Sequence, residues 1–354
     1  MSSRADYTFA SDNAAGICPE AWAALAAANS GRAPSYGEDP WSARAKLRFN
    51  EVFETECEVF FVFNGTAANA LALSACCRSY QSILCHETAH ADVDECGAPE
   101  FFTGGSKVIA TSGPGGKLSP AAVEAALGLG HSVHQPKPGV LSLTQSTEWG
   151  TVYTPDEVRA LAGVARAHGM AVHMDGARFA NAAAALQARG VSPADFTWRA
   201  GVDVLCFGGT KNGMLTTEAV VFFNRALATD FAYRVKQGAQ LASKLRFGAA
   251  QWEAMLADGA WLRHGAHANA RARQLAEAIR HVPGVRLILE PEVNSVFLDL
   301  PDPVHAALQA RGRFFWRFLY PSIHEHGYRL MCAWDTTEQD IAAFVADLRT
   351  AAGV

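Results

Sequence analysis

The middle of the chain alternates short apolar runs with amphipathic helical segments, and this alternation limits the possible folds more than any other feature. The segment Thr154–Glu157 (Thr-Pro-Asp-Glu) is a capping box with proline at the first helical position, and Gly169 ends the helix that it starts. Met170–Met174 then indicates a strand. Ser192-Pro193 predicts the start of another helix, and Val202–Phe207 predicts a second strand. Strands and helices that alternate in this way predict a mostly parallel sheet with helices on both faces.

The C-terminal part has a different pattern, in which strands follow one another and are flanked by helices. We therefore expect an α/β fold with three parts: an N-terminal segment (1–40) that packs near the functional site, a large domain (41–255) with the mostly parallel sheet, and a smaller α+β domain (256–354). The further predicted elements are strands at Ser82–Cys85, Lys107–Ala110, Val140–Thr144, Arg286–Leu289, Ser295–Leu300 and Arg329–Ala333, and helices at Pro19–Asn29, from Ser119, at Arg271–His281 and from Asp335 to near Ala352.

Composition excludes several classes of protein. With 354 residues, 49% hydrophobic and 18% charged, the chain is long and apolar enough to fold without disulfides or a structural metal. A net charge of −5 argues against nucleic acid or an anionic membrane as partner. Apolar runs such as Val59–Phe63 are far shorter than the ~20 residues of a membrane span. The first residues hold no apolar signal segment, and the eight cysteines form no C-x-x-C pair, so we expect free thiols in a cytoplasmic protein.

Three polar segments follow apolar strands, at the sheet edge where ligands bind in parallel α/β proteins. The strand Val59–Phe63 is followed by Gly65 and Thr66 at the start of an alanine-rich helix, which suits a phosphate or a simple capped turn. Asp175 follows the second strand and Lys211, flanked by glycines, the third. Asp175 could instead cap the next helix, and Lys211 could instead bind an anion. Together, a phosphate cradle, a carboxylate and an amine are what pyridoxal phosphate requires.

Other motifs lead to weaker interpretations. His86-Glu87-Thr88-Ala89-His90 matches the zinc-protease pattern H-E-x-x-H, but that pattern requires a helix, and the preceding residues predict a strand. A histidine at a strand end can instead stack on a planar ring. The chain has neither a G-x-G-x-x-G after a strand nor a G-x-S-x-G elbow, which argues against a dinucleotide-binding enzyme and a serine hydrolase.

These residues carry a resemblance to the pyridoxal-phosphate-dependent β-eliminating lyase and threonine aldolase family, and within it to the low-specificity L-threonine aldolases. The resemblance implies fold type I of the pyridoxal-phosphate enzymes, and its motifs run in order over nearly the whole chain. The matching segments are Ser11–Asn13, Tyr36–Asp39, Asn64–Asn69, Thr88–His90, Asp94–Glu100, His173–Arg178, Cys206–Gly213 and Arg329–Asp335.

The resemblance implies a role for each matching residue at the cofactor. Lys211 would form the Schiff base, Asp175 would pair with the pyridine nitrogen, and His90, not His86, would stack on the ring. Arg178 would approach the ring oxygen or the substrate carboxylate. Gly65 and Thr66 would bind the phosphate. Arg246 would reach the phosphate, including that of a neighbouring subunit, although it could equally be a solvated helix charge.

For the substrate, the resemblance implies that Ser11 and Arg329 bind the α-carboxylate and that His134 lies near the β-hydroxyl. His134, His90 or an ordered water would be the base. One segment departs from the family pattern: relatives have Glu-Asn-Thr-His where this chain has Thr144–Trp149 (Thr-Gln-Ser-Thr-Glu-Trp), near the substrate side of the ring. Recognition of the β-substituent is therefore open.

The implied activity is retro-aldol cleavage of L-threonine, L-allo-threonine and related β-hydroxy-α-amino acids to glycine and an aldehyde. The alternatives are β-elimination or transamination with the same cofactor, or a regulator that keeps the fold without catalysis. The resemblance also implies a homotetramer, and no metal site is expected.

Overall fold

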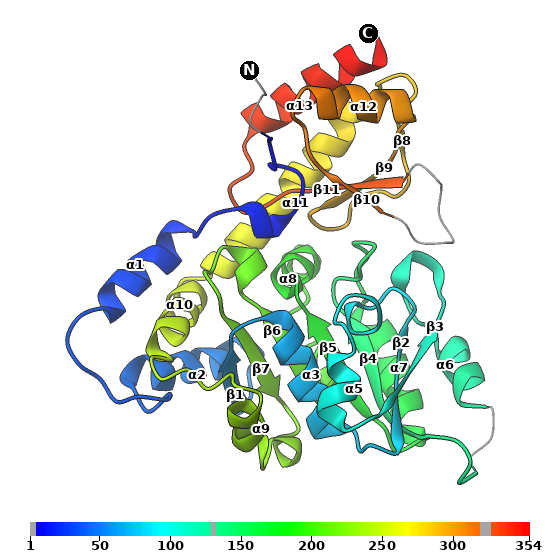
Figure 1. Ribbon diagram of the computed structural model, residues 1–354. Coiled ribbons are helices and arrows are strands. Elements are labelled where there is room, and N and C mark those ends of the chain that lie inside the picture. The colour runs from blue at the N-terminus through cyan, green and yellow to red at the C-terminus, as the bar shows by residue number, and fades with distance from the viewer. Residues whose placement is uncertain (1–4, 129–131, 319–326) are drawn as a thin grey trace.

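The computed structural model describes residues 5–128, 132–318 and 327–354, and it contains two sheets (Figure 1). The larger sheet has seven strands in the order β1-β7-β6-β5-β4-β2-β3, and only β7 runs antiparallel to its neighbours. The mostly parallel sheet predicted from the sequence is therefore confirmed. Its strands are β1 (Glu58–Val62), β2 (Gln81–His86), β3 (Lys107–Thr111), β4 (Lys137–Thr144), β5 (Ala171–Gly176), β6 (Val204–Gly208) and β7 (Glu218–Phe222).

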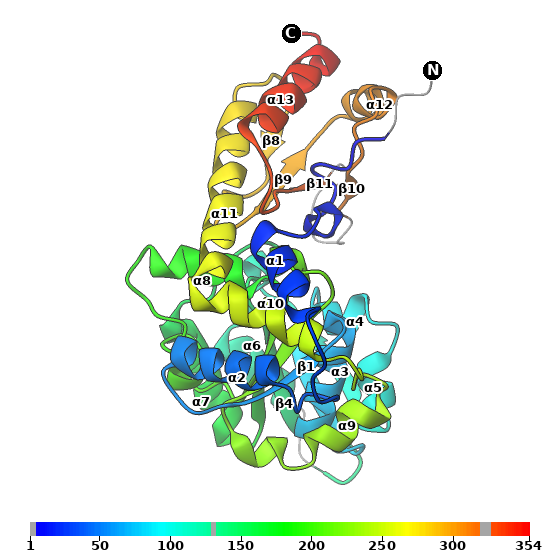
Figure 2. The same cartoon turned by 90° about the vertical axis from the view of Figure 1, so that its left-hand side faces the viewer.

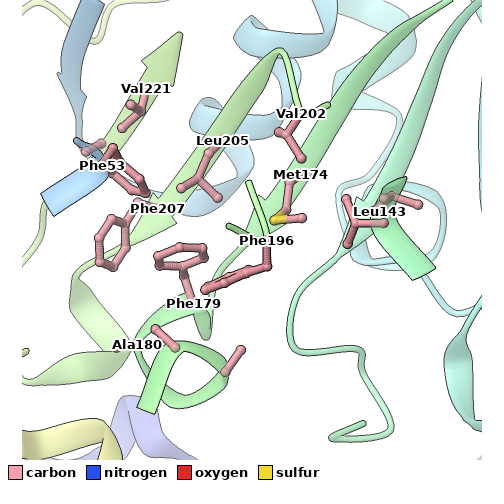
Figure 3. Packing of buried hydrophobic residues seen from close by; sticks show 14 of the residues in the cluster. Phe53, Leu143, Met174, Phe179, Ala180, Phe196, Val202, Leu205, Phe207 and Val221 are labelled. Atoms are coloured by element: carbon pink, nitrogen blue, oxygen red, sulfur yellow. The ribbon is translucent and has the colours of Figure 1, made fainter. Parts of the chain in front are cut away.

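Helices cover both faces of this sheet. One face packs against α2 (Pro40–Phe53), α6 (Pro120–Leu127), α7 (Pro155–Ala167), α8 (Phe179–Gln187) and α10 (Arg246–Ala257), and the other against α3 (Gly65–Cys76), α4 (His90–Val93), α5 (Ala98–Thr103) and α9 (Phe231–Gln237). The first face holds the largest hydrophobic cluster. Figure 3 shows part of it, where Phe179 packs on Phe196 and Phe207 with ring centroids 5.1 and 4.7 Å apart.

The second sheet is antiparallel and has its own hydrophobic core. Its order is β10-β11-β9-β8, formed by β8 (Arg286–Leu287), β9 (Ser295–Asp299), β10 (Trp316–Arg317) and β11 (Gly327–Met331). The long α11 (Ala260–Ile279) belongs to both parts: Trp261 lies in the core of the large sheet, while Leu275 lies in the core of the small one. Figures 1 and 2 show this helix running from one part to the other, with α12 (Asp302–Ala310) and α13 (Glu338–Ala352) beside the small sheet. The division near residue 256 remains a prediction.

The N-terminal segment runs from the small sheet to the large one. Phe9 belongs to the second core, and its carbonyl accepts a hydrogen bond from the Met331 N–H at 2.9 Å. The segment then forms the 3₁₀-helix η1 (Asp12–Ala14), which packs against η4 (Thr210–Asn212), and continues into α1 (Pro19–Ala28) along α10 (Figure 2). The first residues of the chain therefore lie beside the turn that carries Lys211.

One predicted helix is wrong. Ser192-Pro193 begins a series of turns that end in the 3₁₀-helix η3 (Trp198–Ala200). Asp195 accepts a hydrogen bond from the Ser192 N–H at 3.0 Å, and Thr197 adopts φ −115°, ψ −108°, outside the helical region. Local side-chain bonds of this kind compete with a regular helix.

No helix in the described ranges is long and apolar enough to cross a membrane. All eight cysteines are free thiols, as expected, and five of them are buried.

Candidate active site

The large sheet brings the three predicted strand ends into one cleft. Strands β1, β5 and β6 run in the same direction, so their carboxyl ends share one edge. Lys211, Asp175, His90, Gly65 and Thr66 all line a single cavity there. The structure therefore brings these groups together at one place, and their roles in a reaction remain predictions.

The start of α3 forms the anion-binding wall of the cleft. Asn64, directly after β1, caps the helix by accepting a hydrogen bond from the Ala67 N–H at 2.9 Å. The first N–H groups of a helix have no partner within it, and the helix dipole favours an anion at this end. A side-chain carbon built on Gly65 would meet no atom within 4 Å, so there is room in front of these N–H groups. The geometry suits a phosphate.

Asp175 presents a buried carboxylate at the end of β5. Its side chain accepts hydrogen bonds from the Asn69 amide nitrogen and from the Ala177 N–H, both at 3.0 Å. Only 4% of the residue is exposed to solvent. These bonds fix the orientation of the carboxylate in the cleft, where it can accept a hydrogen bond from a protonated ring nitrogen.

Lys211 lies on η4, directly after β6, in a turn that the glycines make possible. A side-chain carbon on Gly208 would lie 2.4 Å from the Ala177 carbonyl oxygen, and one on Gly209 would lie 2.5 Å from that of Thr217. Gly213 adopts φ +94°, which side chains disfavour. The glycines therefore allow backbone carbonyls of the same chain to pack closely against this turn, and this packing fixes the position of Lys211.

Glu218 is a buried acidic residue beside Lys211 that the sequence reasoning did not identify. It begins β7, and its carboxylate accepts a hydrogen bond from the Gly209 N–H at 2.6 Å. Burial raises the pKa of Glu218 to about 6, although bonds from Thr210 and Gly209 and the charge of Lys211 act in the opposite direction. The only signal in the sequence is a glutamate at the head of an apolar run.

His90 is tied to Asp175 through two residues that also had no predicted role. Its Nδ1 lies 2.9 Å from the Glu95 carboxylate, and the Asn69 amide nitrogen donates to Glu95 at 2.8 Å and to Asp175. The hydrogen bond to Glu95 raises the pKa of His90. This bond fixes the ring plane, as stacking on a flat cofactor requires. His86, by contrast, lies outside the cleft lining, with its ring nitrogens near Thr88 and the Gly113 carbonyl.

Two arginines and two carboxylates form a charged cluster next to the cleft. Asp12, whose side chain is fully buried, binds Arg178 with both oxygens, at 2.7 and 3.0 Å. Burial alone would raise the pKa of Asp12, but the charge and hydrogen bonds of Arg178, the charge of Lys211 and the hydrogen bond from Asn294 together outweigh burial and lower this pKa to about 2. Arg329, on β11, faces Glu148 at 3.5 Å. Glu148 also lies 3.9 Å from Arg178. Neither Asp12 nor Glu148 had a predicted role.

Ser11 lies at the edge of this cluster. Its hydroxyl caps η1 by accepting a hydrogen bond from the Asn13 N–H at 3.1 Å, and η1 packs against the turn of Lys211. The structure therefore brings Ser11, Arg178 and Arg329 to the same side of the cleft.

Two predicted site residues lie elsewhere. His134 is exposed on the loop before β4, which begins at Lys137, so it lies at the amino-terminal edge of the sheet, opposite the cleft. Arg246 begins α10, with its guanidinium over the rings of Trp41 and Phe247, and it does not line the cleft. Neither residue joins the site formed within one chain: His134 lies at the opposite edge of the sheet, and Arg246 is not among the residues that line the cavity. A role for them at the site would require a second copy.

Metal-ligating side chains gather at one place in the described ranges. Ligand atoms of Cys18, Glu20 and His264 lie within 4.8 Å of one another, but Glu20 and His264 already bind each other at 3.1 Å. The H-E-x-x-H histidines are not in this group, since His86 ends strand β2 and the intervening residues form a turn.

Comparison with known proteins gives a consistent result. The family model described as beta-eliminating lyase matches residues 8–303. The chain is 56% identical to the low specificity L-threonine aldolase of Pseudomonas aeruginosa (98% of this chain, 99% of the relative) and 54% identical to that of a Pseudomonas species (96% of each). Among solved structures, threonine aldolase from Leishmania major has a TM-score of 0.89 at 28% identity (98% of this chain, 100% of that chain). Serine palmitoyltransferase from Sphingomonas wittichii shares the fold, with a TM-score of 0.72 at 15% identity (97% of this chain, 86% of that chain).

Proposed function

This chain belongs to the β-eliminating lyase family, and we propose that it is a pyridoxal-phosphate-dependent L-threonine aldolase. It is a carbon–carbon lyase that cleaves L-threonine, L-allo-threonine and related β-hydroxy-α-amino acids to glycine and an aldehyde. The observation that carries this proposal is the single cleft that contains Lys211, Asp175 and the start of α3. The activity that names both Pseudomonas relatives supports the same reaction.

The residues of the cleft fit pyridoxal phosphate. Gly65 and Thr66 line the cavity at the start of α3, where the first N–H groups have no partner within the helix and can take a phosphate, and Asp175 offers a buried carboxylate for a pyridine nitrogen. His90, held by Glu95, presents a ring that can stack on the cofactor. Lys211 would supply the amine that binds the cofactor covalently. When bound, pyridoxal phosphate supplies an aromatic ring that accepts the electron pair left on the substrate α-carbon.

The remaining residues orient the amino acid and manage its protons. Arg329 and Ser11 would bind the α-carboxylate, and Arg178 would assist from its fixed position on Asp12. Asp175 would keep a proton on the pyridine nitrogen of the cofactor, because a buried carboxylate favours the positively charged ring. The β-hydroxyl proton must go to a base: His90, an ordered water, or His134 of a second copy. The hydrogen bond to Glu95, which raises the pKa of His90, favours its protonated form and so makes His90 a weaker candidate for this base.

The remaining expectations belong to the same proposal. The substrate is a small amino acid, and the protein is a cytoplasmic homotetramer made of two dimers. Support for the assembly comes from His134 and Arg246, which lie outside the cleft of their own chain and are available to another. The free cysteines suit a reducing compartment. We also keep the three-part division at residues 40 and 255.

The test is an aldehyde-release assay with three substrates. Purified protein loaded with pyridoxal phosphate is incubated with L-threonine, L-phenylserine and L-serine, and acetaldehyde, benzaldehyde, glycine and pyruvate are measured. We expect acetaldehyde and benzaldehyde, each in a 1:1 ratio with glycine, and loss of both in Lys211→Ala. Pyruvate without aldehyde would show a β-eliminating enzyme instead.

A further inference from the structure

Glu148 occupies an anion position between the two arginines of the cluster. One oxygen of its carboxylate, Oε2, lies 3.5 Å from Nη1 of Arg329 and 3.9 Å from Nη1 of Arg178. The Glu148 side chain is only 11% exposed and the two arginine side chains 20% and 8% exposed, so bulk water screens these charges weakly. A single carboxylate oxygen therefore faces two partly buried guanidinium groups.

The loop that carries Glu148 is anchored on both sides. Before it, the side-chain amide of Gln145 exchanges hydrogen bonds with the Tyr153 backbone, both at 3.0 Å. After it, Trp149 stacks on Phe297 at 5.8 Å, and a side-chain carbon on Gly150 would lie 2.1 Å from the Ser295 hydroxyl. The backbone at residue 148 thus has a fixed place, and only the glutamate side chain is free to turn away from the arginines.

The contacts of Glu148 are longer than those of Asp12 with the same arginine. Asp12 binds Arg178 at 2.7 and 3.0 Å, whereas charge-assisted hydrogen bonds to Glu148 would require about 2.7–2.9 Å. Asp12 also accepts a bond from Asn294 at 3.1 Å, so it is a permanent partner. Glu148 is the partner that a second carboxylate can replace, because such a carboxylate can approach the guanidinium groups more closely.

Asp12 and Glu148 already place two carboxylates against the guanidinium groups of Arg178 and Arg329 before any substrate enters. The α-carboxylate of an amino acid that binds here adds a further negative charge beside Glu148, which costs free energy in a weakly screened site unless Glu148 leaves. The charges of the cluster and of the cleft influence one another. The charge of Lys211 helps to lower the pKa of Asp12, although less than Arg178 does. The charge of Glu148 helps to raise the pKa of His90, although less than the hydrogen bond to Glu95 does.

We propose that Glu148 is an internal competitor of the substrate: its carboxylate occupies the place of the α-carboxylate between Arg178 and Arg329, and it must swing away when the amino acid binds. The proposal rests on the proposed function, because it needs an amino acid at this cleft. Glu148 acts as a positioning residue that holds Arg329 in place in the empty site and sets the affinity for both substrate and glycine.

The test compares glycine binding by the holoenzyme and its Glu148→Gln variant, measured by isothermal titration calorimetry. Removing the competing charge should lower the dissociation constant for glycine by about tenfold, as expected when a competing ion pair worth roughly 1.4 kcal/mol is removed. The KM for L-threonine should fall in parallel. Glu148→Asp, whose shorter side chain reaches less far, should bind glycine with intermediate affinity.

Glu292→Gln is the matched control. Glu292 accepts a hydrogen bond from the Val152 N–H at 3.2 Å, so this variant removes one negative charge beside the same loop without touching the arginines. We expect its affinity for glycine to stay within about twofold of that of the unmodified protein.

Equal or weaker binding of glycine by Glu148→Gln would overturn the proposal, because it would make Glu148 a support for the arginines and not a competitor. A tenfold gain in Glu292→Gln would do the same. Failure of the proposed function gives a different result: the unmodified protein would then release no aldehyde from L-threonine, whatever the binding data show.

Discussion

The buried ion pair between Asp12 and Arg178 should contribute strongly to stability, and Asp12→Asn tests this. The substitution keeps the size of the side chain but removes the charge that faces Arg178, whose side chain is only 8% exposed. The pKa of Asp12 is about 2 against an ordinary 3.8, which corresponds to roughly 2 kcal/mol of favourable interaction at neutral pH. Removing one partner of a buried pair also leaves the other charge uncompensated, and such changes cost about 3–5 kcal/mol.

We expect a loss of about 3 kcal/mol, near the lower limit, because Glu148 at 3.9 Å still offsets part of the Arg178 charge. The assay is urea denaturation of the apoenzyme followed by tryptophan fluorescence at pH 7. Glu58→Gln, which breaks an exposed pair with Arg225, is the control and should lose less than about 1 kcal/mol. The folded-state pKa of Asp12 is lowered, so its contribution is present above pH 3.8 and is lost as the pH falls toward 2. A loss in Asp12→Asn no larger than that of the control would refute the reasoning.

Two further substitutions test the cleft itself. Asp175→Asn keeps the size of the side chain and one of its two acceptor oxygens, but it cannot hold a proton on the pyridine nitrogen. Turnover of L-threonine should therefore fall by roughly 100- to 1000-fold while the absorbance of the bound cofactor remains, and undiminished turnover would contradict the role of Asp175. Glu218→Gln should stabilise the apoenzyme by up to about 2 kcal/mol at pH 8, because the pKa of Glu218 is raised by burial from 4.5 to about 6 and its ionised form costs stability above that pH. The gain in stability should disappear as the pH falls from 6 to 4.5. If the variant and the native protein have the same free energy of unfolding in urea at pH 8, ionised Glu218 does not destabilise the fold.

Local patterns predicted the scaffold well. The capping box is formed as expected, with the Thr154 hydroxyl and the Glu157 carboxylate each accepting a backbone N–H, and the helix runs from Pro155 to Ala167. The strand before Lys211 and the one before Asp175 lie within two residues of their predicted ends. These elements depend on residues close in sequence, so periodicity and capping identify them. The same logic failed at Ser192, where Thr197 bonds back to the Pro193 carbonyl and closes a turn.

Long-range contacts could not be predicted in this way. Asp12 and Arg178 are 166 residues apart, and Glu148 and Arg329 are 181 residues apart. No spacing rule connects such residues, because they meet only after the small sheet and the N-terminal segment have packed over the cleft. The position of His134 shows the converse limit: a residue can match a family motif and still lie at the other edge of the sheet from Lys211 in its own chain.

The central claim is that Lys211 binds the cofactor covalently in a cleft shared with Asp175. The most direct measurement is borohydride reduction of the protein loaded with pyridoxal phosphate, followed by mass spectrometry of its peptides. Reduction should attach the cofactor irreversibly to the peptide that contains Lys211 and leave Lys211→Ala unlabelled. A label on any other lysine, or none at all, would contradict the account.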